Sequence, residues 1–99
     1  MRSSTIIAAF LSLMGSVTAS KHHNCGCTIR GKYDTTLSGS ACALWKSIGN
    51  PNTHFDGYSC VDPGSGRGID GEPWEINCQN EYSIANGGVP DDARGYCWH

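Results

Sequence analysis

The sequence predicts a small disulfide-rich α+β domain in which one helix packs on a short antiparallel sheet of three or four strands. Three features indicate this class: six cysteines, one stretch with the helical spacing of apolar residues, and several short stretches in which apolar and polar residues alternate. A chain of 99 residues buries little apolar surface, so covalent cross-links are the expected source of its stability.

Residues 1–20 have the order of a secretory signal peptide. Arg2 supplies a positive start, residues 6–14 form an apolar run, and small residues lead to a cleavage position after Ala19 or Ser20. The apolar run is too short to span a bilayer. We therefore expect a secreted, extracellular protein in which residues 21–99 form a single disulfide-stabilised domain without a membrane anchor.

All six cysteines follow this leader: Cys25, Cys27, Cys42, Cys60, Cys78 and Cys97. An even number of cysteines in a short exported chain predicts a disulfide framework, with a zinc site as the alternative. Zinc is disfavoured because the closest pair is separated by a single residue, whereas zinc sites prefer wider spacings. Each bridge is expected to contribute about 2–4 kcal/mol to stability.

Residues 25–29 alternate in a way that predicts a short strand with Cys25 and Cys27 on the same face. A bond between these two cysteines would close a strained ring, so we expect each of them to pair with a different partner. The sequence does not determine the remaining disulfide pairings. We favour a bond from Cys42 to a cysteine of the sheet.

An apolar helical stripe follows, made of Leu37, Ala41, Leu44, Trp45 and Ile48. Residues 34–36 offer N-cap oxygens, and residues 49–51 supply a stop. Gly39 weakens the first turn, so the helix is expected to begin as late as Ser40. Trp45 is expected in the core.

The rest of the chain is expected to form strands and loops. Residues 58–60 predict a short strand and residues 63–68 a glycine-rich loop. Asp70-Gly71 has the sequence of a tight hairpin turn. Residues 86–92 form a second loop, and residues 95–98 a last strand held by Cys97.

Trp74, Ile76 and Cys78 alternate with polar residues and predict the clearest strand of the chain. On such a strand Trp74 and Ile76 share an apolar face, and we expect Trp74 to belong to the core. Glu72 and Glu75 then lie beside the strand and on its polar face, in contact with water.

The charged residues are few and scattered. Residues 21–99 hold six Lys and Arg against nine Asp and Glu, because the seventh basic residue is Arg2. Nucleic-acid binding needs clustered basic residues, and cationic membrane-lytic peptides need a basic face. We therefore expect neither a nucleic acid nor a membrane as partner. We also expect the protein to be a monomer.

The cysteine frame has a characteristic context: Asn24-Cys25-Gly26-Cys27, Ser40-Ala41-Cys42, Gly57-Tyr58-Ser59-Cys60 and Gly68-Ile69-Asp70-Gly71, followed by Trp74, Cys78 and Cys97. In this it resembles a loose class of small secreted fungal cysteine-rich proteins. Members of that class are often candidate effectors that act on a host or on a competing microbe. The resemblance implies such a setting and supplies no site residues.

Residues 50–58 are similar to a second group, the fungal guanyl-specific ribonucleases and related RNase-like effectors, in which a helix precedes a histidine-containing aromatic stretch. This similarity implies a small hydrolase that uses His54. The glutamate expected after the histidine is absent, and Asp56 is the nearest carboxylate. The second histidine of a late strand is missing unless His99 replaces it.

The new N-terminus predicts a metal site. Cleavage after Ser20 places His23 third in the mature chain, and cleavage after Ala19 places His22 third. A free amine, two backbone amides and a third-position imidazole form the square-planar nitrogen site that Cu(II) and Ni(II) prefer. No other cofactor is expected.

No catalytic residue is assigned, so the expected function is that of a non-enzymatic secreted interaction protein, an effector acting outside the producing cell. Its partner is expected to be an extracellular protein or glycan of a host or competitor. The expected binding elements are the loops 62–71 and 86–94, with Arg67 and Asp70, and an aromatic anchor formed by Tyr96 and Trp98. The alternatives are a toxin or antimicrobial protein, the small hydrolase, and a metal- or carbohydrate-binding module.

Overall fold

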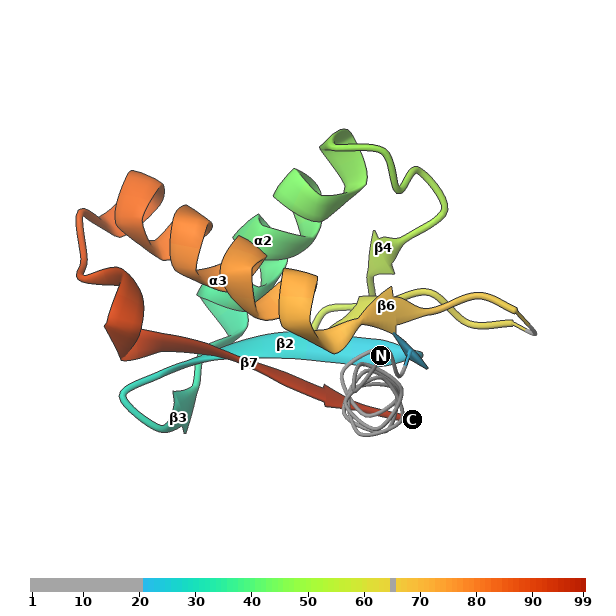
Figure 1. The fold of residues 1–99 in the computed structure, drawn as a ribbon, viewed down its shortest axis with the longest axis horizontal. Coiled ribbons are helices and arrows are strands. Elements are labelled where there is room, and N and C mark those ends of the chain that lie inside the picture. Colours follow the sequence, from blue (N-terminus) through green and yellow to red (C-terminus); the bar gives the residue numbers. More distant parts are fainter. Residues whose placement is uncertain (1–20, 65) are drawn as a thin grey trace, which may run out of the picture.

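The computed structural model describes residues 21–64 and 66–99 and shows a small disulfide-rich α+β fold (Figure 1), which confirms the predicted class. The predicted signal peptide lies outside the described residues. In chain order the elements are β1 (Lys21–His22), β2 (Asn24–Ile29), β3 (Lys32–Tyr33), α2 (Thr35–Ser47), β4 (His54–Phe55), β5 (Cys60–Val61), β6 (Ile69–Asp70), α3 (Gly71–Asn86), the 3-10 turn Pro90–Asp92 and β7 (Ala93–Trp98). None of the helices in these ranges is long and apolar enough to cross a lipid bilayer.

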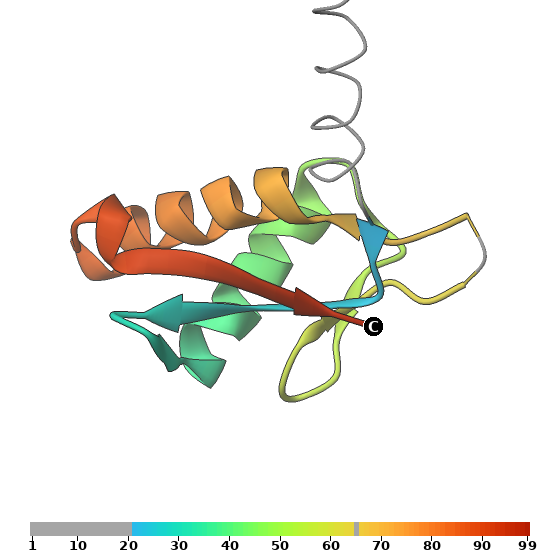
Figure 2. The same cartoon turned by 60° about the horizontal axis from the view of Figure 1, so that its bottom comes forward.

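Strand β2 is the centre of the sheet. It pairs with β7 along one side and with β3 and β5 along the other, and β5 pairs with β4, always antiparallel. When the short β3 is left aside, the four remaining strands lie in the order β7-β2-β5-β4. Helix α2 lies in the connection from β2 to β4, and helix α3 in the connection from β5 to β7. This is the split β-α-β, or ferredoxin-like, arrangement. Both described helices lie on the same side of β2 and β7 (Figure 1 and Figure 2), and among residues 21–64 and 66–99 no helix lies on the other side of these strands.

Three elements contact the same edge of β2: strand β5 at its beginning, strand β3 at its end, and the start of helix α2 between them. The start of α2 contacts the backbone of Cys27. The N–H of Cys27 donates to Ser38 Oγ at 2.8 Å, and the N–H of Asp34 donates to the Cys27 carbonyl at 2.9 Å. The backbone groups of β2 are therefore satisfied even where no strand is adjacent, as buried peptide groups require.

Three disulfide bonds connect the layers: Cys25–Cys97 joins β2 to β7, Cys27–Cys78 joins β2 to α3, and Cys42–Cys60 joins α2 to β5. The expectation that Cys25 and Cys27 take different partners is confirmed, as is the bond from Cys42 to a cysteine of the sheet. Such a framework is typical of proteins from an oxidising compartment.

The core lies between the helices and the sheet. The rings of Trp45 and Trp74 meet edge to face, with centroids 5.6 Å apart. The indole N–H of Trp74 donates to the carbonyl of Gly26 at 2.8 Å, so a fully buried donor has its partner in β2. Asn77 in turn donates to the Ala41 carbonyl at 2.8 Å and fixes α3 against α2. Both tryptophans are core residues, as predicted.

Helix α2 buries Leu37, Ala41 and Trp45 of the predicted stripe and begins earlier than Ser40, whereas Ile48 is the exposed C-cap and not part of the buried face. Asp34 is the N-cap, and its Oδ1 accepts a hydrogen bond from the N–H of Leu37 at 2.7 Å. Gly39 is tolerated inside the helix because the ring of Phe55 packs against it, and a Cβ at this position would lie 3.2 Å from that ring.

The predicted strand at 74–78 is wrong, because these residues belong to the 16-residue helix α3, and the described residues form two α-helices instead of the one expected. Asp70-Gly71 is accordingly no hairpin turn, since Asp70 is the N-cap of α3 and Gly71 its first residue. Ile76 does not share the face of Trp74 and is 53% exposed. The buried positions Trp74, Asn77, Cys78 and Tyr82 instead follow helical spacing.

Helix α3 also covers the free edge of β7. The N–H of Gly95 donates to Glu75 Oε2 at 3.1 Å, and Gln79 Nε2 donates to the Ala93 carbonyl at 3.1 Å. Glu75 is therefore half-buried and bonded to β7, not solvated on a strand as expected. Capping an edge in this way removes groups that another strand would pair with.

We predict that the double variant Glu75→Ala/Gln79→Ala lowers the free energy of unfolding by about 1–3 kcal/mol, because two backbone groups of β7 lose their partners. Denaturant unfolding measures this loss, and light scattering is expected to show increased self-association. Asn80→Ala, an exposed amide of the same helix, is the control. Equal stability and solubility of the double variant and the control would contradict this role of α3.

Candidate functional site

Four aromatic residues gather on the side of the sheet that carries no helix: Tyr33, Tyr58, Tyr96 and Trp98. We call this group the aromatic surface. Strand alternation explains its position, because Gly95 of β7 contacts Trp74 and Glu75 of α3, so the neighbouring side chains of Tyr96 and Trp98 point the other way. Tyr58 and Tyr96 are more than half exposed.

The rings of the aromatic surface are in mutual contact. Tyr33 and Tyr58 stack with centroids 4.4 Å apart and planes inclined by 18°. Trp98 approaches both of them edge to face, at 6.2 and 6.1 Å, and lies 5.4 Å from Tyr96. Aromatic pairs at such distances attract one another beyond simple burial, so each ring limits the motion of its neighbours.

Tyr33 is positioned by the hairpin of β2 and β3. A two-residue turn joins these strands, with positive φ at Arg30 (50°) and Gly31 (83°), as in a type I′ turn. This register places Tyr33 opposite Thr28. The Tyr33 ring then lies directly over Gly26, where any Cβ would collide with it. A glycine in the middle of β2 is therefore required for the aromatic surface.

Tyr58 is positioned by the turn between β4 and β5. Asp56 Oδ1 accepts hydrogen bonds from the N–H groups of Tyr58 at 2.9 Å and Ser59 at 2.8 Å. These bonds, led by that from Ser59, hold the pKa of Asp56 below its usual value. The Tyr33 hydroxyl donates to the Tyr58 carbonyl at 2.6 Å, and burial raises the pKa of Tyr33, which keeps this donor protonated.

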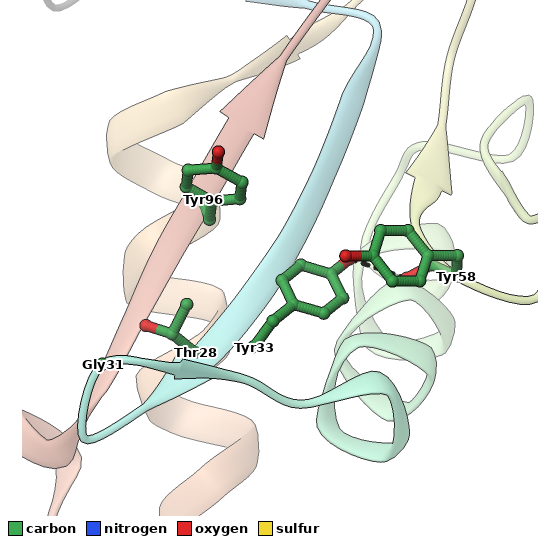
Figure 3. Close-up of a pocket in the computed structure, with 5 residues that line it drawn as sticks. All are labelled: Thr28, Gly31, Tyr33, Tyr58 and Tyr96. Carbon is green, nitrogen blue, oxygen red and sulfur yellow. Dashed lines mark hydrogen bonds between the residues drawn. The ribbon is translucent and has the colours of Figure 1, made fainter.

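A hollow of about 320 Å³ opens beside the aromatic surface (Figure 3). It is lined by Thr28, Gly31, Tyr33, Tyr58 and Tyr96. Figure 3 shows Tyr96 on one side and Tyr33 with Tyr58 on the other, with Thr28 and Gly31 at one end. All five residues are uncharged, so the hollow offers π faces and hydroxyl groups but no fixed charge.

Of the four residues predicted to bind a partner, the structure brings only two together. Tyr96 and Trp98 share a face, as expected. Arg67 and Asp70 do not line the hollow. Arg67 Nε instead forms an ion pair with Asp62 Oδ1 at 2.9 Å. The backbone of Asp70 lies opposite that of Lys21 where β6 pairs with β1.

The two loops expected to bind a partner are shorter than predicted. The segment 62–71 ends in strand β6 and the first residue of α3, and the segment 86–94 contains the 3-10 turn and the start of β7. Tyr33 and Tyr58 were missed by the sequence analysis. The available signal was the Arg30-Gly31 turn after β2, which predicts a hairpin and places Tyr33 beside Thr28.

The predicted metal ligands, His22 of β1 and His23 after it, lie near the last residue of the chain. The ring of His99 is 5.3 Å from that of His22 and 5.7 Å from that of His23. Across residues 21–64 and 66–99, no three His, Cys, Asp or Glu side chains are arranged to hold a metal ion. The predicted copper site needs one imidazole together with the terminal amine and amides, so it stays a prediction. Its amides lie in or next to β1, which pairs with β6.

His54 and Asp56, the pair that a hydrolase would need, lie on the surface. Both side chains are exposed, and His54 adds a small effect to the lowered pKa of Asp56. The Asp56 carboxylate already accepts two backbone hydrogen bonds, so its evident role is to shape the turn that presents Tyr58.

Fold and site together define a disulfide-rich α+β domain with an aromatic surface on the uncovered side of its sheet. No family model matches the chain, and comparison with curated proteins and with solved structures finds no match either. The ferredoxin-like arrangement occurs with many unrelated functions and therefore assigns none.

We predict that the Tyr58–Tyr33 stack loosens at acid pH. Because the pKa of Asp56 is lowered in the folded state, its stabilising effect is complete above the carboxyl pKa of the unfolded chain and is lost as the pH falls through the folded pKa. The ring proton shifts of Tyr33 and Tyr58, followed by NMR, report this loss. Asp56→Asn keeps an acceptor oxygen without a titrating group, and an identical transition in that variant would contradict the assignment.

We also predict that the mature protein binds one equivalent of Cu(II) or Ni(II) through its terminal amine, two amides and the third-position histidine. Because these amides belong to or adjoin β1, binding is expected to release β1 from β6. A copper titration followed by visible absorption and by the amide shifts of Ile69 and Asp70 tests this. A chain whose N-terminal amine is acetylated, and which therefore lacks one of the four nitrogen ligands, is the control.

Proposed function

We propose that this protein is a secreted, non-enzymatic interaction protein of the fungal effector type, which acts outside the producing cell. The aromatic surface is the part that contacts its partner. The observation that carries this proposal is the gathering of Tyr33, Tyr58, Tyr96 and Trp98 on the side of the sheet without a helix. The fungal setting rests on the resemblance of the cysteine frame.

The composition of this surface supports a binding role. Tyrosine and tryptophan are enriched at interfaces and dominate the binding energy where they form the centre of a contact. Each ring has few rotatable bonds, so little conformational entropy is lost when a partner orders it. Contacts with neighbouring rings already restrict Tyr58 and Trp98 before binding.

The scaffold under this surface supports action outside a cell. Strand β2, which lies below Tyr33 at Gly26, is covalently bonded to β7 and α3 by Cys25 and Cys27. Disulfides persist in oxidising compartments and keep a small domain folded in the presence of proteases. A rigid sheet also reduces the entropic cost of binding.

The alternatives receive less support. A hydrolase would use His54 with a nearby carboxylate, but Asp56 is engaged in the turn before Tyr58. A toxin acting on membranes through charge is disfavoured by the excess of acidic residues. Neither alternative explains why four aromatic rings stand on the uncovered side of the sheet.

The test compares binding of the labelled mature protein to intact cells and cell walls of candidate hosts and microbes. We predict that Tyr58→Ala/Tyr96→Ala lowers the apparent affinity about tenfold or more, as expected when two central aromatic contacts are removed. Ile76→Ala/Ile84→Ala is the matched control, because these side chains of α3 are 53% and 78% exposed in the helical layer.

Unchanged binding of the aromatic variant, or an equal loss in the control, would place the interface elsewhere. Circular dichroism and thermal unfolding of both variants check that the fold is intact. Failure of the wild-type protein to bind any of these surfaces would count against the proposed function as a whole.

A further inference from the structure

We propose that the hollow beside the aromatic surface binds a neutral sugar ring, so that the extracellular partner is an uncharged oligosaccharide. This inference rests on the proposed function and names the ligand class of the same site. It follows from three properties of the hollow: the absence of charge among its lining residues, the exposed aromatic faces, and the unused hydroxyl groups.

The lining selects against charged ligands. Its members are Thr28, Gly31, Tyr33, Tyr58 and Tyr96, none of which carries a charge at neutral pH. A phosphate or carboxylate seated here would lose hydration, and no lining residue carries a positive charge to offset this cost. Arg94, which pairs with Thr28 across β7 and β2, is one basic residue beside the hollow and not a cluster that would follow a nucleic-acid backbone.

The aromatic rings fit the faces of a sugar. A pyranose presents C–H groups on its flat faces, and these are attracted to the negative π face of an aromatic ring. Tyr58 and Tyr96 are 52% and 55% exposed and stand on opposite sides of the hollow. The volume of about 320 Å³ is at the small end of ligand sites and suits one ring of a longer chain.

The hydroxyl groups fit the edge of a sugar. Among hydrogen bonds between described residues, the side-chain hydroxyls of Thr28, Tyr58 and Tyr96 take part in none, whereas the Tyr33 hydroxyl donates to the Tyr58 carbonyl. The three unused groups can both donate and accept. Sugar hydroxyls need partners of this kind, whereas an apolar peptide side chain would leave them unsatisfied.

The experiment is an NMR titration of the ¹⁵N-labelled, disulfide-intact mature protein with three neutral probes: cellohexaose, chitohexaose and a mannose hexamer. At least one probe is expected to shift the amides of Thr28, Gly31 and Tyr96 at millimolar concentration. Tyr96→Ala is expected to weaken this binding about five- to tenfold, and Tyr96→Phe, which keeps the ring, less than Tyr96→Ala. Ile84→Ala is expected to bind as the wild type does.

Three outcomes would overturn the sugar proposal. They are no shift with any of the three hexamers, shifts confined to residues outside the hollow, and equal binding by Tyr96→Ala and the wild type. Choline chloride and a short single-stranded RNA are titrated in parallel, and binding of either at the hollow without sugar binding also overturns it. In each case the cell-surface assay with Tyr58→Ala/Tyr96→Ala still decides the proposed function independently.

Discussion

The structure depends on the covalent attachment of strand β2 to its neighbour in the sheet, β7, and to helix α3, which packs on that sheet. Cys25 bonds to Cys97 of β7, and Cys27, two positions further along β2 and on the same face, bonds to Cys78 of α3. The two bridges therefore fix the edge strand and the second helix to one short segment. A domain of this size gains little from its core alone, so these cross-links are what allows the uncovered side of the sheet to remain without a covering layer.

Gly26, which lies between these two cysteines, separates the structural side of the sheet from the binding side. Its carbonyl accepts the indole N–H of the buried Trp74, which fixes α3 on the inner side. Its missing side chain lets the Tyr33 ring lie on the outer side, and Tyr58 then stacks on Tyr33. The buried core and the disulfides therefore lie on the side of the sheet that the helices cover, and the exposed rings and hydroxyl groups lie on the opposite side. This division explains how so small a chain can be stable and still present an aromatic surface.

The sequence predicted the elements whose signals are local. The alternation around Cys25 and Cys27 and the stripe of α2 both indicate the elements that are found. Helix α3 was missed because Trp74, Ile76 and Cys78 mimic a strand, and because a buried polar residue, Asn77, interrupts its apolar face. The pair of Tyr96 and Trp98 was predictable from strand alternation. Their contact with Tyr33 and Tyr58 was not, because a hairpin turn and a separate strand connection bring those rings together in space. Secretion, effector action and metal binding stay predictions.

The most direct test of this account is the disulfide map of the native protein. Partial reduction with stepwise alkylation, followed by tandem mass spectrometry, distinguishes Cys25 from its near neighbour Cys27. The account predicts Cys25–Cys97, Cys27–Cys78 and Cys42–Cys60. Exchanged partners, with Cys25 bonded to Cys78 and Cys27 to Cys97, would contradict it, because β7 and α3 would then be attached to β2 in a different register and the aromatic surface would not form as described.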